Sequence, residues 1–285
     1  MGLFSGLEGM GLEGFKDTSI IEKKDAVDSA GDGSASSEKK ESDYLIDRRY
    51  TCPVCETVFT TRSVKAGKVR IESKDTDLKP IYDFVDVGKY DAITCDSCGY
   101  SSLTKYFGKI TSKQVKLVKE KVSACFNRDS IDNKKEIYDY DDAIKRYKLA
   151  LVCTVVKNAK NGERAYTSLR LAWILRSKRL SLPENDPMVK SLYEDELEGL
   201  KAAFEGFQLA MSDEDFPIAG MDEMTLKFVL ADIARKFKNY NAAARFVADI
   251  MISKKASSRL KDEAYNLRER IKEDMKSDVA SIKPS

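Results

Sequence analysis

Two short cysteine pairs decide how the first half of this chain folds: CPVC at residues 52–55 and CDSCG at residues 95–99. Each pair has the C-x-x-C spacing of a zinc knuckle, a tight turn for which Pro53 and Gly99 are well suited. Four thiolates form a closed tetrahedral shell around a metal ion and leave no position open for a substrate. The sequence therefore predicts one structural zinc site, with the ligands Cys52, Cys55, Cys95 and Cys98.

Other uses of these four cysteines are less favoured. The first residues show no signal-peptide pattern, so we expect a reducing cytosol, where disulfides are rare. A thioredoxin-like redox pair needs a βαβ pattern, which this region lacks. A rubredoxin-like iron site uses the same ligands, but Glu56 follows the first pair where a glycine is expected. Cys125 and Cys153 lie in helical surroundings and are expected to be small buried core residues.

The 39 residues between the two pairs are expected to form strands over residues 57–64, 68–73, 81–85 and 92–94, in a zinc ribbon with an elongated sheet. Residues 74–80 read KDTDLKP. This segment lacks the third acidic position and the glycine of an EF-hand calcium loop. We therefore expect Asp75 and Asp77 to cap a turn before Pro80.

These motifs resemble, in combination, those of the bacterial domain-of-unknown-function family 2225. The resemblance rests on CPVC, KDTDLKP-x-Y, YD and CDSCGYSS, which begin at residues 52, 74, 90 and 95. It extends from about residue 50 to the C-terminus. It implies a zinc-ribbon-like module followed by tetratricopeptide-like helices, with the Asp-Thr-Asp segment in the framework of the module. The family has no established activity, so the resemblance implies an architecture rather than a function.

From about residue 137, proline and glycine become sparse and apolar residues recur every three or four positions, which predicts helices. Residues 140–151 resemble the second helix of a tetratricopeptide repeat, where small residues on either side of an aromatic residue let two helices approach. Two later triplets repeat that spacing at intervals of 60 and 40 residues: Ala203, Phe207 and Ala210, and then Ala243, Val247 and Ile250.

Those intervals exceed the 34 residues of regular repeats, so longer helices are expected, such as 166–179 and 187–211. Trp173 is expected to lie in the core. We expect the helical region to have its own core and to stay folded without the zinc site. An ordinary helical bundle with alanine at close contacts is the alternative.

Charge and composition divide the chain further. Residues 1–47 carry a net charge of −6, residues 48–121 of +6 and residues 122–285 of +2. The predicted organisation is an amphipathic arm at 1–15, a disordered acidic linker at 16–47, a zinc-ribbon-like module at 48–103, a basic connecting helix region at 104–135, helical repeats at 136–276 and a flexible tail at 277–285.

The arm contains large apolar side chains between five glycines, each of which costs about 1 kcal/mol in a helix. It is predicted to be a docking peptide that becomes ordered on a partner, through Leu3, Phe4, Leu7, Leu12 and Phe15. A frayed terminus is the alternative. Membrane contact is less favoured, because the charges of the arm are acidic.

A run of lysines follows the second cysteine pair at helical spacing. If it forms one helical face, four of its members are candidate phosphate contacts: Lys105, Lys109, Lys113 and Lys116. Few aromatic residues and no arginine stand among these lysines to read bases, so a solvated helix face is the simpler explanation.

The chain contains no histidine, which excludes Ser-His-Asp and Cys-His catalysis and H-E-x-x-H metalloprotease sites. No apolar run is long enough to span a membrane. The sequence thus predicts a mainly α protein with a small β zinc module. The predicted function is a cytoplasmic, non-enzymatic adaptor that binds a protein or peptide partner through its helical-repeat surface. A nucleic-acid-associated factor that uses the zinc module and the lysine-rich face is the alternative.

Overall fold

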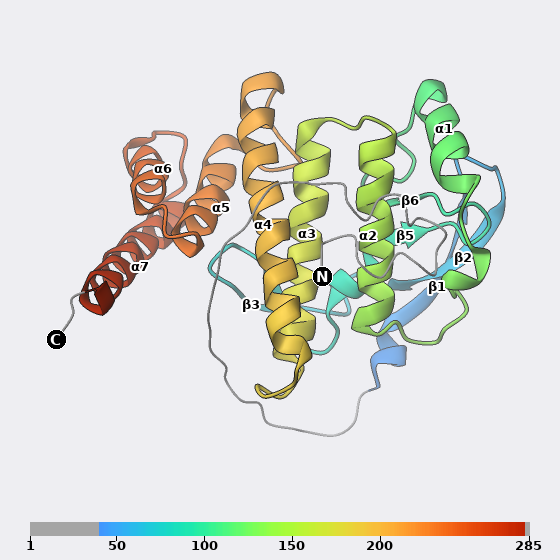
Figure 1. The fold of residues 1–285 in the computed structure, drawn as a ribbon, viewed down its shortest axis with the longest axis horizontal. Coiled ribbons are helices and arrows are strands. Elements are labelled where there is room, and N and C mark those ends of the chain that lie inside the picture. Colours follow the sequence, from blue (N-terminus) through green and yellow to red (C-terminus); the bar gives the residue numbers. More distant parts are fainter. Residues whose placement is uncertain (1–39, 283–285) are drawn as a thin grey trace.

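The computed structural model describes residues 40–282. The predicted arm, most of the predicted linker and the last three residues lie outside this range. The described chain is mainly helical, and its strands all lie in the N-terminal half (Figure 1). The strands are β1 (Leu45–Thr51), β2 (Val58–Val64), β3 (Ile71–Lys74), β4 (Pro80–Tyr82), β5 (Ala92–Thr94) and β6 (Ser101–Leu103).

The strands form three separate antiparallel hairpins, β1–β2, β3–β4 and β5–β6. The prediction of one elongated sheet is wrong for the described residues. The reason is that the hairpins attach to different parts of the helical body: β5–β6 packs on α2, whereas the β3–β4 turn forms ion pairs with the helices that follow α2. The predicted strands at 57–64 and 92–94 agree closely with β2 and β5, while β1 and β6 are not predicted.

Residues 40–47 are ordered, so the prediction of a disordered linker is wrong for this part. Glu41–Tyr44 form a 3₁₀ turn that leads directly into β1. Tyr44 and Leu45 are buried in a small apolar cluster with Val85. The Glu41 carboxylate lies 2.7 Å from Nζ of Lys89 and accepts a hydrogen bond from the Tyr90 hydroxyl at 2.6 Å. These contacts fix the point at which the described chain begins.

The helices are α1 (Ser112–Val118), α2 (Tyr140–Val156), α3 (Asn161–Leu180), α4 (Met188–Asp213), α5 (Glu223–Lys236), α6 (Tyr240–Ile252) and α7 (Ser258–Ile282). From α2 onward each helix packs on its successor, and α2, α3 and α4 lie side by side while α5, α6 and α7 form a second group beyond α4 (Figure 1). Among the described helices, none is both long and apolar enough to cross a membrane.

The triplets of small and large apolar residues identified in the sequence lie at helix contacts. Three residues of α4 and three of α2 at the same spacing are fully buried: Ala203, Phe207 and Ala210, and Ala143, Tyr147 and Ala150. The α3–α4 approach is especially close, because a Cβ atom at Gly206 would come within 2.9 Å of the Ala165 Cβ. Small residues therefore set the distance between these two long helices.

Apolar packing is continuous between the cysteine region and the first helices. One core surrounds the cysteines and includes Tyr147 and Cys153 of α2 and Leu171 of α3. A second core lies between α3, α4 and α5 and contains Trp173, as expected. A third core belongs to α5, α6 and α7. The helical region therefore has two cores of its own, and it shares the first core with the cysteines through α2 and parts of α3 and α4.

Candidate functional site

The structure brings together the four cysteines of the two C-x-x-C pairs. Their sulfur atoms all lie within 4.8 Å of one another. The Cys52–Cys98 and Cys55–Cys95 sulfur pairs are both 3.6 Å apart. Four sulfurs at about 2.3 Å from a tetrahedral zinc ion are separated by about 3.8 Å, whereas a disulfide needs about 2.05 Å. The geometry thus fits a metal ion and not a pair of disulfides.

The two cysteine turns have the same backbone hydrogen bonds. The N–H of Cys52 donates to the carbonyl of Thr57 at 3.0 Å, and the N–H of Cys95 donates to the carbonyl of Tyr100 at 2.9 Å. In each turn the residue four positions after the first cysteine donates back to that cysteine's carbonyl at 2.9 Å. The two knuckles are therefore local copies of one turn.

The residues that donate back, Glu56 and Gly99, both adopt a left-handed backbone, with φ of 64° and 74°. A side chain at Gly99 would be strained by this backbone conformation, and its Cβ would also lie 2.5 Å from the ring of Phe126. Glu56 has the conformation for which a glycine is expected, so its departure from the pattern leaves the knuckle geometry intact.

The electrostatics of the cluster call for a cation. Cys52 and Cys95 are fully buried. Hydrogen bonds from the thiols of Cys95 and Cys98 lower the pKa of Cys52 to about 4. The contact with ionised Cys52 in turn raises the pKa of Cys98. Because one thiolate suppresses ionisation of its neighbours, four thiolates exist together here only around a positive ion.

The two remaining cysteines differ from each other. Cys153 is fully buried on α2 and accepts a hydrogen bond from the Ser101 N–H at 3.4 Å. Burial raises the pKa of Cys153 to about 12, so this thiol is not reactive. Cys125, expected to be buried, is exposed. The reason is that the helical segment ends before it, in a π turn at Lys119–Ser123 that follows the short α1.

The Asp-Thr-Asp segment forms the turn of the β3–β4 hairpin and makes buried ion pairs with α3. The guanidinium of Arg176 lies 2.5 Å from a carboxylate oxygen of Asp75 and 2.7 Å from one of Asp77. The same guanidinium lies 2.6 Å from Glu196 of α4. Asp77 is completely buried.

A second set of contacts joins the same turn to α5. Nζ of Lys236 lies 3.1 Å from both Asp77 and Asp232, and the Thr76 hydroxyl donates to Asp232 at 2.9 Å. Burial raises the pKa of Asp77, but Lys236 and Arg176 outweigh burial and hold this pKa well below its usual range. Asp77 therefore stays ionised inside the protein.

The predicted turn cap describes only a small part of this arrangement. Asp77 does accept a hydrogen bond from the Lys79 N–H, at 3.3 Å. Its stronger partners, Arg176 and Lys236, follow it by 99 and 159 residues. Sequence reasoning missed both, because a buried basic residue in an amphipathic helix has the same local pattern as an exposed one.

The lysine run does not form one helical face, because α1 begins only at Ser112. Lys105 is half-buried before it, with Nζ 4.1 Å from the centre of the Tyr166 ring and hydrogen-bonded to the Ala219 carbonyl. Lys109, Lys113 and Lys116 are exposed, so these three stay candidate phosphate contacts.

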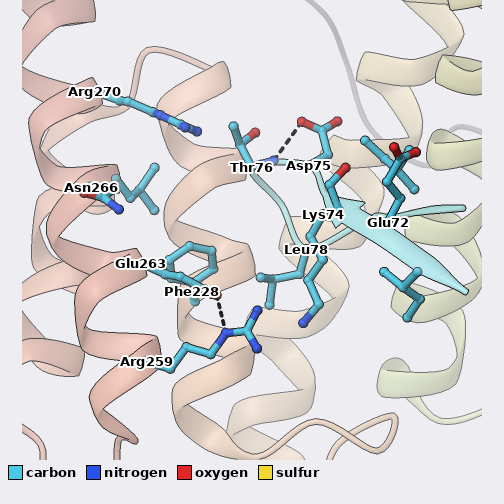
Figure 2. A pocket seen from close by; sticks show the side chains of 14 residues that line it. Glu72, Lys74, Asp75, Thr76, Leu78, Phe228, Arg259, Glu263, Asn266 and Arg270 are labelled. Atoms are coloured by element: carbon cyan, nitrogen blue, oxygen red, sulfur yellow. Dashed lines mark hydrogen bonds and ion pairs between the residues drawn. The ribbon is translucent and has the colours of Figure 1, made fainter. Parts of the chain in front are cut away.

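A cleft of about 720 Å³ lies between β3 and α7, and we name it the β3–α7 cleft. Its apolar lining includes Leu78, Phe228 and Leu267. Figure 2 shows Arg259 and Arg270 of α7 on one side and the β3 segment on the other. Sequence reasoning missed this cleft, because its two walls are almost two hundred residues apart in the chain.

A family model described as "uncharacterized protein conserved in bacteria (DUF2225)" matches residues 45–271. The chain belongs to this family. The DUF2225 match covers all three hairpins and helices α1 to α6, and it confirms the resemblance expected from the cysteine and Asp-Thr-Asp motifs. No curated protein and no solved structure matches the chain.

Proposed function

We propose that this protein is a zinc-stabilised, non-enzymatic cytoplasmic adaptor that binds an extended segment of a protein partner in the β3–α7 cleft. The observation that carries the proposal is the open strand at this cleft. Among the described strands, β3 pairs with β4 alone, so its other edge is unpaired. All four residues of β3 are exposed. An extended peptide gains main-chain hydrogen bonds by adding a strand to such an edge.

The lining of the cleft suits a peptide with apolar and acidic side chains. Phe228 and Leu267 offer an apolar floor, and Ile71 and Ile81 are exposed beside it at 55% and 40%. Lys74 and Arg270 add positive charge at the walls and Glu72 adds one negative charge, while Arg259 is paired with Glu263. Alternate side chains of an added strand point to one face, where such pockets give specificity.

Zinc is the metal we propose for the cysteine cluster. Four thiolates in tetrahedral reach of one another, three of them buried, are typical of structural zinc, and no ligand position is left for a reacting molecule. Zinc bound here would hold the two knuckles together and support the core that they share with α2 and α3. Its proposed role is therefore stability and not catalysis.

The test is selection of peptides from a random displayed library on the full-length protein. Ile71→Asp should reduce binding of the selected peptides at least about tenfold, because a carboxylate at the apolar rim is unfavourable. Leu209→Asp on α4 is the matched control, since Leu209 is also 55% exposed. Equal loss in both variants, or loss in neither, would contradict the proposed site.

A nucleic-acid-associated role is the second candidate, and an exposed arginine beside an aromatic ring favours it. Arg48 is exposed on β1, and its guanidinium lies 5.7 Å from the centre of the Tyr50 ring. Binding of a generic single-stranded RNA at about 50 and 200 mM salt tests this candidate, because phosphate contacts weaken steeply with salt. Absence of binding at the lower salt would exclude it.

A further inference from the structure

The β3–α7 cleft has a candidate occupant within the same chain. We propose that residues 2–15 lie in this cleft in cis, as an extended strand along β3. This inference rests on the proposed function, because both use the same cleft, and it names the segment that fills the cleft when no partner is bound.

The outer edge of β3 is open. β3 offers unpaired main-chain groups, and the side chains of Ile71 and Ile81 are exposed at the same place. An open strand edge with exposed β-branched residues promotes pairing between molecules, and native proteins normally cover such edges. A segment of the same chain covers the edge at every protein concentration, whereas a separate partner covers it only when present.

Residues 2–15 are close enough along the chain to reach β3. The described chain begins beside Lys89, where Glu41 forms its ion pair. Tyr82, which pairs with Ile71 of β3, precedes Lys89 by only seven residues, or at most about 25 Å of chain. Residues 16–39 provide 24 residues, whose root-mean-square span is about 25–29 Å. The segment 2–15 thus reaches the cleft without strain.

The side chains of residues 2–15 are complementary to those that line the cleft. Residues 2–15 contain large apolar side chains, two glutamates and no basic residue. At the cleft, Asp75 is already paired with Arg176, and Glu263 with Arg259. Lys74 and Arg270 are therefore the basic side chains that the walls offer to an incoming carboxylate, against one acidic side chain, Glu72, and the apolar floor accepts leucine or phenylalanine. The five glycines of the segment disfavour a helix and allow close approach to β3.

Hydrogen exchange of the full-length protein tests this placement. Amides within residues 2–15 should exchange at least about tenfold more slowly than in an unstructured peptide. Ile71→Asp should abolish that protection, and the matched control Leu209→Asp should preserve it. Bound zinc and the melting temperature report that each variant is folded. Free exchange of residues 2–15 in the unmodified protein would overturn the inference.

Protein concentration separates docking in cis from docking on a second copy. Protection that is unchanged on hundredfold dilution supports docking in cis, and protection lost on dilution overturns it in favour of a second copy.

A second variant separates this inference from the proposed function. Leu7→Asp combined with Phe15→Asp removes two apolar contacts of the segment and leaves the cleft unchanged. Selected library peptides should then bind the protein at least about tenfold more tightly, because the internal competitor is lost. Unchanged peptide affinity, with binding still dependent on Ile71, would overturn the inference and leave the proposed function standing. Peptide binding independent of Ile71, with residues 2–15 still protected, would overturn the proposed function alone.

Discussion

Two of the hairpins are attached to the helices by opposite kinds of interaction. The β5–β6 hairpin packs on α2 through the apolar core that encloses the cysteines, with Tyr100, Leu103 and Cys153 all fully buried. The β3–β4 hairpin instead inserts an aspartate turn between α3 and α5, where Arg176 and Lys236 neutralise Asp77. The first attachment depends on apolar contact around the cysteine cluster, and the second depends on charge.

The difference shows how very short strands become stable. Both hairpins have strands of only three or four residues, and isolated two-stranded hairpins are marginal in water. The apolar core around the cysteine cluster, with the proposed metal, would supply the missing free energy at one hairpin, and an ion-pair network fixes the position of the other. The two hairpins are therefore expected to respond differently to metal loss, to loss of one charge and to pH.

The largest effect is expected from loss of the metal. Cys98→Ser should abolish binding of the proposed zinc ion, which in structural sites contributes an apparent ~10–16 kcal/mol to folding. Because the cysteines share a core with α2 and α3, amide protection should fall in those helices as well and persist in α5, α6 and α7. Hydrogen exchange and metal analysis measure both results. Cys125→Ser, outside the cluster, is the control, and full protection of α2 in Cys98→Ser would contradict the shared core.

Loss of one buried charge should have the next largest effect. Asp77→Asn removes the buried anionic partner of Arg176 and Lys236. Removal of one partner of a buried ion pair typically lowers the unfolding free energy by about 3–5 kcal/mol. Urea denaturation should show this loss while bound zinc stays unchanged.

Glu72→Gln is the matched control for Asp77→Asn, since it neutralises an exposed carboxylate of the same hairpin. Equal stability of Asp77→Asn and Glu72→Gln would show that the network adds nothing to the attachment.

A pH effect of intermediate size is expected at Asp195 of α4. Burial raises the pKa of Asp195 to about 6, and Lys148 at 3.6 Å offsets this only in part. A group whose folded pKa is raised contributes most stability below its ordinary pKa of 3.8 and loses it as pH rises through about 6.

Asp195→Asn should remove that dependence. When the pH is raised from about 4.5 to 7.5, the difference in unfolding free energy between Asp195→Asn and the unmodified protein should grow by about 1–2 kcal/mol in favour of the variant. Denaturation at both pH values gives this difference directly. Parallel pH profiles for the two proteins would show that Asp195 does not titrate in this range.

The smallest effect on stability is expected from substitutions at equivalent positions of the two knuckles. Glu56 has a left-handed backbone that favours glycine, so Glu56→Gly should raise the unfolding free energy by about 0.5–1 kcal/mol. Gly99→Ala at the equivalent position of the other knuckle should instead destabilise the protein, because its Cβ would meet Phe126. Thermal unfolding with zinc bound measures both, and a destabilised Glu56→Gly would mean that the Glu56 side chain makes a needed contact.

The sequence by itself determined the local features of this protein. Two C-x-x-C pairs specify a four-sulfur cluster wherever they meet, because thiolate chemistry and turn geometry depend on neighbouring residues. The triplets of small and large apolar residues likewise identified buried helix positions such as Ala203 and Phe207, because helical periodicity is a local property. The family motifs are also local, and the match over residues 45–271 agrees with them.

Only the tertiary structure decided which distant elements meet. Asp77 reads as a turn residue until α3 and α5 bring Arg176 and Lys236 to it, and Lys105 reads as exposed until Tyr166 lies beside it. The cleft between β3 and α7 depends in the same way on the path of the whole chain. Burial of charge and the shape of a cleft are set by contacts between segments far apart in sequence, and no local pattern specifies those contacts.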